Sequence, residues 1–234
     1  IILCHGYINP SKYKTTSGYL ADMNFYASHG FAVIKPDFRG QGLSSRQGMA
    51  TSAYYSMDYN VDLLSLVSSL KQTDYINKAD LNLWGHSMGA YIALRASVTS
   101  KDIKSVVLLS SPGDSLKQLY ETYIPPSDEN NSAALKVRAD VFDKYGTPAK
   151  DSDFWRSAEL VSSLTGSAVT YQINVGLKDN IVPPVLSADL NSAMNTAGVR
   201  HQYFTYPAGQ HDLDAQRGQI WSRSLQLFEP DQNI

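Results

Sequence analysis

The stretch Gly85-His86-Ser87-Met88-Gly89 stands between a short apolar run at 81–84 and a helix-prone run of small residues at 90–98. A serine on a sharp turn from strand to helix leaves no room for side chains two positions before it or two after it, and glycine occupies both positions here. The turn also puts the serine hydroxyl at the start of a helix, where free N–H groups favour developing negative charge. The pentapeptide therefore predicts a nucleophilic serine.

The bulk properties exclude several classes of function. The chain has 234 residues, 43% hydrophobic and 18% charged, with a formal charge of -2, which is ordinary for a soluble protein and gives nucleic acid little to bind. No apolar stretch approaches the roughly 20 residues of a transmembrane helix. The five histidines show no short metal-ligand spacing such as HExxH. We therefore expect one domain over 1–234, with no nucleic-acid partner, transmembrane segment, metal or organic cofactor.

Short β-rich runs recur along the chain, with helix-like segments between most of them. The runs are 1–4, 31–35, 81–84, 105–110, 169–175 and 202–206. Beyond the run at 90–98, helix-like segments cover 18–28, 58–70 and 184–197, and Gly30 and Gly198 are typical helix stops. Alternation of this kind predicts an α/β fold, in which a mostly parallel sheet is covered by helices on both faces.

A long segment separates the predicted strand that ends near Ser111 from the one that starts near Val169. It is too long for one crossover helix and its two turns. We expect a lid insertion at about 112–166, with two helices at about 133–145 and 152–164, that shapes the substrate pocket. The alternative is that the segment only covers one edge of the sheet.

A serine hydroxyl is a poor nucleophile near neutral pH until a base takes its proton, so the chain should supply a histidine and an acid that orients it. His211 lies in the loop after the last β-rich run, and Asp179 lies at the end of the run before it. The order Ser87, Asp179, His211 is the one expected for a nucleophile on such a turn. Asp114, which follows an earlier run, is the alternative acid. His86 is expected to point away from the nucleophile.

The negative charge that develops on the substrate oxygen needs N–H donors aimed at it. One typically comes from the residue after the nucleophile, here Met88, and one from the loop after an early strand. The run at 1–4 ends in His5-Gly6-Tyr7, so the Tyr7 N–H is the natural second donor. Gly6 would let the backbone approach the substrate. We expect an oxyanion hole formed by the backbone N–H groups of Tyr7 and Met88.

With these residues assembled, the chain resembles the α/β-hydrolase superfamily from His5 to about Leu213. The segment Pro36-Asp37-Phe38-Arg39-Gly40-Gln41-Gly42-Leu43-Ser44 looks like the loop after the fourth strand of that family. Asp153-Phe154-Trp155 and Gly176-Leu177-Lys178-Asp179-Asn180-Ile181-Val182-Pro183 are similar to the catalytic domain of prolyl-oligopeptidase-type serine peptidases and their stand-alone esterase relatives. The resemblance implies an α/β-hydrolase fold and the hydrolysis of an ester or amide through an acyl-enzyme.

The chain also departs from the family's pattern. The family's sheet usually has two further strands before the one at 1–4, so we expect these either upstream of Ile1 or missing from a trimmed fold. On the family's numbering, the lid insertion follows the sixth strand. Peptidase members often have a second glycine after the motif, whereas Ala90 follows Gly89 here, and the sequence shows no β-propeller domain. Ala90 in place of the second glycine and the lack of a β-propeller favour an esterase over a peptidase.

The leading hypothesis is a serine carboxylic-ester hydrolase that acts on small or aromatic esters, including feruloyl-type esters. The aromatic preference rests on six residues of the predicted lid, which are Tyr120, Tyr123, Phe142, Tyr145, Phe154 and Trp155. A peptidase or acylaminoacyl hydrolase of the prolyl-oligopeptidase type is the first alternative, because amide and ester cleavage use the same triad. A non-catalytic binding protein on the same scaffold is the second, and an acyltransferase a further one.

Overall fold

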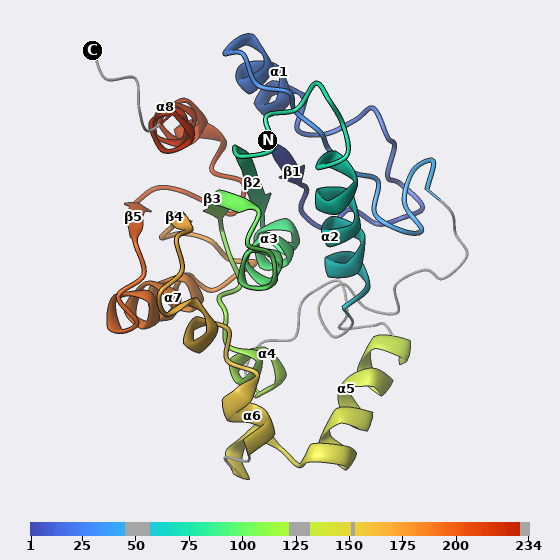
Figure 1. Cartoon of the computed structure of the whole chain (residues 1–234). Coiled ribbons are helices and arrows are strands. Elements are labelled where there is room, and N and C mark those ends of the chain that lie inside the picture. Colours follow the sequence, from blue (N-terminus) through green and yellow to red (C-terminus); the bar gives the residue numbers. More distant parts are fainter. Residues whose placement is uncertain (45–56, 122–131, 151–152, 230–234) are drawn as a thin grey trace.

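The structure is a computed structural model of the chain and describes residues 1–44, 57–121, 132–150 and 153–229. Within these ranges, five parallel strands form one sheet, and their order across it follows their order in the sequence (Figure 1). They are β1 (Ile2–Cys4), β2 (Leu81–His86), β3 (Ile103–Leu109), β4 (Thr170–Gly176) and β5 (His201–Tyr206). All strands therefore present their carboxyl ends at the same edge, where parallel sheets bind their ligands.

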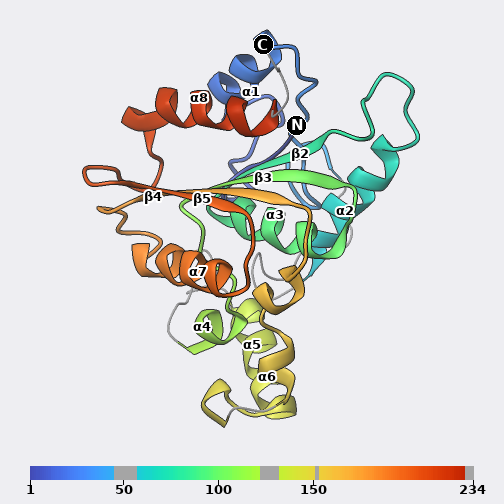
Figure 2. The ribbon, with the colours of Figure 1, turned by 60° about the vertical axis from the view of Figure 1, so that its left-hand side comes forward.

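Helices cover both faces of this sheet, as the sequence predicts. Figure 2 shows α1 (Leu20–Ser28) and α8 (Arg217–Phe228) on one face, and α2 (Asp58–Leu70), α3 (Met88–Thr99) and α7 (Pro184–Thr196) on the other. Side chains alternate between the faces along each strand: Trp84 of β2 packs with the cluster under α1 and α8, whereas Leu83 packs with α2 and α3. Every residue of β2 is buried, as expected for a strand covered on both sides.

The predicted strand at 31–35 is wrong in extent. The structure has a single parallel bridge there, between Ile34 and Ile2 of β1. Ile34 accepts from the Leu3 N–H at 2.8 Å and donates to the Ile1 carbonyl at 2.9 Å. Pro36 stands two residues after Ile34 and has no N–H, so it cannot donate the next bond of the ladder. The apolar pattern thus marks a segment that lies beside β1 without forming a strand.

The long segment between β3 and β4 contains several short helices in its described part. It contains α4 (Leu116–Glu121), α5 (Ser132–Tyr145), α6 (Asp153–Ser157) and the 3-10 turns η1 (Pro148–Lys150) and η2 (Val161–Leu164). The single helix expected at 152–164 is therefore split at 158–160, where the Glu159 carboxylate accepts from the Ser115 hydroxyl at 2.9 Å. Both ribbon views place α4, α5 and α6 on the far side of α3 and α7 from the sheet (Figures 1 and 2).

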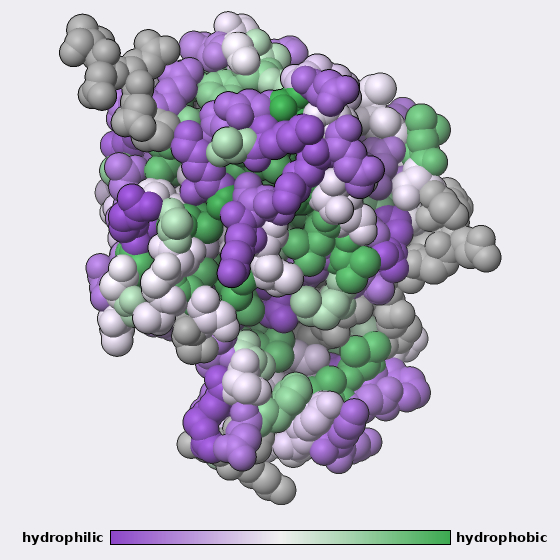
Figure 3. Space-filling view, viewed as in Figure 1, coloured by the Kyte–Doolittle hydropathy of each residue, from purple (hydrophilic) through white to green (hydrophobic). Residues whose placement is uncertain are grey.

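The surface drawn in Figure 3 is largely hydrophilic, with apolar residues at scattered places between polar ones. Within the described residues, none of the helices combines the length and the apolar character required to cross a bilayer. The role of the helical segment as a lid, and the single-domain organisation of 1–234, stay predictions.

Candidate active site

Ser87 stands between β2 and α3 in a conformation that few residues adopt. Its φ is 53° and its ψ is -119°, in a region that costs a non-glycine residue about 1–3 kcal/mol. The Ser87 N–H donates to the Leu109 carbonyl at 2.9 Å, and its own carbonyl accepts from Ala90 at 2.9 Å. These bonds tie the serine to the neighbouring strand and to the first turn of α3. The side chain is buried, with 6% of the residue exposed.

The two glycines around Ser87 are required by close backbone contacts. A Cβ on Gly85 would lie 2.5 Å from the Gly89 carbonyl oxygen. A Cβ on Gly89 would lie 1.9 Å from the carbonyl oxygen of Cys4 and 2.7 Å from that of His5. Gly89 therefore has a role beyond the turn itself, because the lack of a Cβ lets α3 start directly against the end of β1.

Asp179 and His211 come together from the loops after β4 and β5. His211 Nδ1 lies 2.8 Å from Asp179 Oδ2, and both residues are buried. The second carboxylate oxygen accepts the N–H groups of Ile181 and Val182, both at 2.9 Å. Burial alone would raise the pKa of Asp179, but the hydrogen bonds from His211 and these N–H groups outweigh it and lower the pKa. The carboxylate therefore stays ionised and holds the proton of His211 on Nδ1.

Close contact between the two loops brings this pair together. The Lys178 N–H donates to the Gly209 carbonyl at 2.9 Å, and a Cβ on Gly176 would lie 2.5 Å from that same oxygen. Because β4 and β5 are neighbours, their carboxyl-end loops start only one strand spacing apart. The structure thus assigns the His211 Nδ1 bond to Asp179 and not to Asp114, the alternative acid.

The backbone of His211 is held by His86, at the end of β2, and by Ser110, which follows β3. Its carbonyl oxygen accepts from the Ser110 hydroxyl at 2.6 Å and lies 3.1 Å from His86 Nε2. Burial, followed by the neighbouring His211, lowers the pKa of His86 to about 3, so its ring is neutral. The sequence predicts only that His86 points away from the nucleophile. The signal for this contact in the sequence is the place of His86 at the end of a predicted strand, since the loops that follow parallel strands lie on the same edge of the sheet.

The predicted oxyanion donors lie at the expected strand end. Met88 is the first residue of α3, so its N–H belongs to the helix turn that lacks intrahelical partners. Gly89 packs against the carbonyls of Cys4 and His5, which brings the start of α3 next to the loop that holds Tyr7. Tyr7 itself is 40% exposed. Their role as oxyanion donors stays a prediction.

The aromatic residues expected to contact substrate mostly pack against one another. Tyr120 and Trp155 are 3% and 1% exposed, with ring centroids 5.2 Å apart. Phe154 stacks on Tyr145 at 3.8 Å. Phe142 also lies within this group, whereas Tyr123 lies outside the described residues. The buried pair offers little surface to a substrate.

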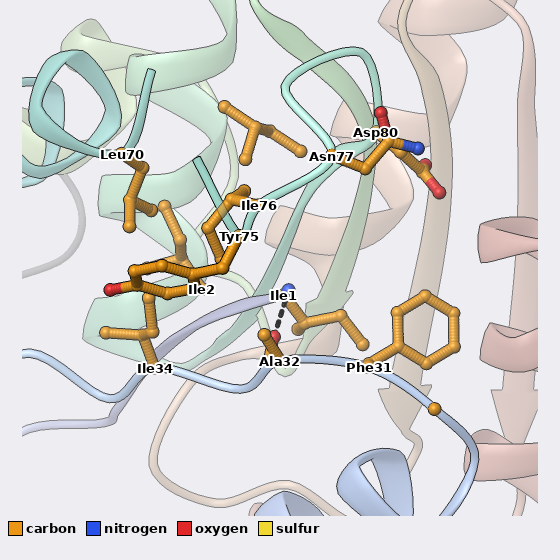
Figure 4. A pocket seen from close by; sticks show the side chains of 12 residues that line it. Ile1, Ile2, Phe31, Ala32, Ile34, Leu70, Tyr75, Ile76, Asn77 and Asp80 are labelled. Atoms are coloured by element: carbon orange, nitrogen blue, oxygen red, sulfur yellow. Dashed lines mark hydrogen bonds between the residues drawn. The ribbon is translucent and has the colours of Figure 1, made fainter. Parts of the chain in front are cut away.

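A cavity of about 300 Å³ lies at the other edge of the sheet. Figure 4 shows it between Ile1, Phe31 and Ile34 on one side and Leu70, Tyr75 and Ile76 on the other. The amino group of Ile1 donates to the Ala32 carbonyl beside it at 2.8 Å. The cavity borders the amino ends of β1 and β2, whereas Ser87 follows the carboxyl end of β2, so the two are separate features.

Comparison with known proteins agrees with this architecture. Residues 1–213 match the family model described as alpha/beta hydrolase fold. An epoxide hydrolase from Caballeronia sordidicola is 34% identical over 113 residues, which cover 48% of this chain and 31% of the relative. The chain therefore spans less than a third of the length of this relative.

Solved structures are similar at low sequence identity. A puromycin-hydrolyzing peptidase from Mycobacterium tuberculosis superimposes with a TM-score of 0.71 at 16% identity, over 100% of this chain and 34% of its own. The Pyrococcus furiosus esterase Pf2001 superimposes with a TM-score of 0.64 at 19% identity, over 98% of this chain and 81% of its own. At these identities the structures show the fold alone. Together with the family match, they establish that the chain belongs to the alpha/beta hydrolase fold family.

Proposed function

We propose that this hydrolase cleaves carboxylic esters through an acyl-serine intermediate. The observation that carries the proposal is the buried Asp179–His211 pair, held at 2.8 Å on the sheet edge where Ser87 occupies its strained turn. A serine, a histidine and an ionised acid on that edge are the parts that nucleophilic acyl transfer needs. A protein that only binds ligands has no need of a serine, a histidine and an acid on one edge, which favours an enzyme over a binding protein.

The state of His211 defines the first step. Its Nδ1 proton is held by Asp179, so Nε2 carries the free lone pair and takes the proton of the Ser87 hydroxyl. The serine oxygen attacks the ester carbonyl, and the carbonyl electrons move to oxygen. The backbone N–H groups of Tyr7 and Met88 stabilise that oxyanion.

Collapse of the tetrahedral intermediate completes acylation, and deacylation by water follows. The carbon–oxygen bond to the alcohol breaks, and His211 gives its Nε2 proton to the leaving oxygen. Water then loses a proton to the same nitrogen and attacks the acyl-serine. The bond from the acyl carbon to the Ser87 oxygen breaks, the carboxylic acid leaves, and His211 returns its Nε2 proton to Ser87. Asp179 stabilises the imidazolium that forms in each half-reaction.

Hydrolysis of p-nitrophenyl acetate and butyrate by the protein and by Ser87→Ala tests the proposal. We expect turnover to fall by at least about 10⁴-fold, and a fluorophosphonate probe to label Ser87 when the modified residue is mapped by mass spectrometry. Ser97→Ala is a matched control, because it removes another buried hydroxyl from the same helix that Ser87 begins. Turnover that survives Ser87→Ala contradicts the mechanism.

Substrate class requires separate assays. Methyl hydroxycinnamates compared with short aliphatic esters test the aromatic preference, and equal rates overturn it. Aminoacyl p-nitroanilides cleaved as fast as esters would support the peptidase or acylaminoacyl hydrolase instead. Protein that neither turns over esters nor reacts with the probe would support the non-catalytic binding protein.

A further inference from the structure

A chain of hydrogen bonds links three loops around Ser87. The Gly6 N–H donates to the Tyr19 hydroxyl at 2.8 Å, and that hydroxyl lies 2.7 Å from His86 Nδ1. The other ring nitrogen of His86 lies 3.1 Å from the His211 carbonyl oxygen. The hydrogen-bond series thus begins next to the predicted oxyanion donor Tyr7 and ends at the backbone of His211.

The groups at the two ends of this series of hydrogen bonds determine which atom donates in each bond. A carbonyl oxygen can only accept, so His86 Nε2 carries the proton and donates it to His211. His86 Nδ1 is then a bare acceptor and takes the hydroxyl proton of Tyr19. Burial raises the pKa of Tyr19 above its ordinary value, so the hydroxyl keeps that proton. The Tyr19 oxygen is left to accept from Gly6, as its position indicates.

Two features show that the surrounding structure enforces these contacts. Tyr19 has a φ of 59°, a left-handed conformation in which a tyrosine is strained. A Cβ on Gly6 would lie 2.8 Å from the Tyr19 hydroxyl and 3.0 Å from His86 Nδ1. Glycine at position 6 therefore makes room for the tyrosine and histidine, and the Tyr19 ring also packs edge-on against Trp84 at 6.0 Å.

We propose that Tyr19 and His86 are positioning residues that hold the Gly6–Tyr7 loop and the His211 loop at a fixed separation on either side of Ser87. The inference rests on the proposed function and names residues of the same site. The oxyanion donor and the base must both be placed within a fraction of an ångström for the transition state, whereas substrate binding tolerates more error. Loss of these hydrogen bonds therefore lowers kcat more than it raises KM.

Tyr19→Phe is the direct test, because it removes only the hydroxyl that joins Gly6 to His86. We expect kcat on p-nitrophenyl butyrate to fall about tenfold while KM changes less than twofold. His86→Leu should lose at least as much. His86→Gln keeps an N–H that can reach the His211 carbonyl and should recover part of that loss.

Tyr26→Phe is the matched control. It removes a buried hydroxyl from α1, the helix that follows Tyr19, at a position outside the chain of hydrogen bonds. We expect its kcat to equal that of the unchanged protein. Wild-type kcat in both Tyr19→Phe and His86→Leu, or an equal loss in Tyr26→Phe, overturns the positioning role and leaves the proposed function intact.

An NMR measurement, which needs no turnover, distinguishes the positioning role from the proposed function. The imidazole Nδ1 proton of His211 and the amide proton of Gly6 can be followed by NMR in the same variants. We expect Tyr19→Phe to shift both signals and Tyr26→Phe to shift neither. If the protein hydrolyses no ester, the proposed function fails, but these shifts still support the positioning of the two loops. Unchanged signals in Tyr19→Phe would disprove it.

Discussion

The carboxyl edge of the sheet and the helical insertion between β3 and β4 are held together in different ways. Within the described ranges, the non-glycine residues with positive φ are Tyr19, Ser87, Ser110 and Leu213. Each of them belongs to the candidate site or directly adjoins it. Strain of this kind persists only where the surroundings over-determine it, and it gathers at functional sites. The carboxyl edge therefore holds its residues in fixed, strained conformations.

The insertion is held by packing of aromatic rings. Trp155 contacts the rings of Tyr120, Phe142 and Phe154, and the Arg138 guanidinium lies 4.6 Å from the Phe142 ring centre. In its described part, over 112–166, the positive φ values belong to glycines, at 113, 146 and 166. In the face drawn in Figure 3, hydrophilic residues line the outer sides of the region where α5 and α6 lie. Ring packing tolerates changes of shape that a strained polar edge does not, and four substitutions test this difference.

Gly89→Ala should have the largest effect. Its Cβ would lie 1.9 Å from the Cys4 carbonyl oxygen, and neither β1 nor α3 can move without breaking the sheet. We expect insoluble protein, or an unfolding free energy lowered by more than about 4 kcal/mol. Gly218→Ala in α8 is the control, because its Cβ meets nothing within 4 Å and should raise the unfolding free energy by about 0.5–1 kcal/mol. Urea titration measures both.

Asp179→Asn should abolish most activity while the protein stays folded. An amide in place of the carboxylate no longer fixes the proton of His211 on Nδ1, so the base presents the wrong nitrogen state to Ser87. We expect kcat to fall about 10⁴-fold. Asp140→Asn removes an exposed carboxylate of the insertion that pairs with Lys136, and should leave kcat unchanged. A loss below tenfold in Asp179→Asn would assign the acid elsewhere.

His86 should make stability depend on pH. Its pKa is about 3 in the folded protein and near 6.5 when unfolded, so below pH 6.5 the unfolded chain takes up a proton that the folded chain does not. Above pH 6.5 this group leaves the unfolding free energy unchanged. Between pH 6.5 and pH 3 it lowers the unfolding free energy by up to about 1.4 kcal/mol per pH unit.

Replacing the ring isolates this contribution. We expect His86→Gln to show a shallower loss of unfolding free energy between pH 7 and pH 5 than the unchanged protein, measured by urea titration. The titratable and charged groups that face His86 are Tyr19, Asp179, His211, Asp212 and Arg217, and they remain in the variant. His29→Gln, which changes an exposed histidine, is the control. Parallel pH curves for His86→Gln and the unchanged protein would contradict a neutral buried ring.

Trp155→Phe should have the smallest effect. It keeps an aromatic ring against Tyr120 but loses the bond from Nε1 to the Gly146 carbonyl at 3.1 Å. We expect the unfolding free energy to fall by about 1–2 kcal/mol and kcat to stay within twofold. A drop in kcat beyond tenfold would show that the insertion acts on the site, which would support its role as a lid.

Most of the fold could be predicted from local patterns. The periodicity at 58–70 predicts α2 over its full length, and α7 and the four strands from β2 to β5 end within a few residues of their expected bounds. The short α4 and the C-terminal α8 are not among the predicted elements, although Ile220, Ser224 and Leu227 lie on one face of α8 at helical spacing. The run at 31–35 is misjudged because its pairing depends on a short partner, β1.

The sequence by itself determined the glycines around Ser87 and the helix stops, because these features act within a few residues and a linear pattern contains them. It also contains the order of serine, acid and base along the chain, which is read without knowing their contacts. The tertiary structure decided that Asp179 and not Asp114 meets His211, and that Tyr19 and His86 join the loops. These contacts connect residues from 13 to 125 positions apart, and only the packing of strands and helices brings such residues within hydrogen-bond distance.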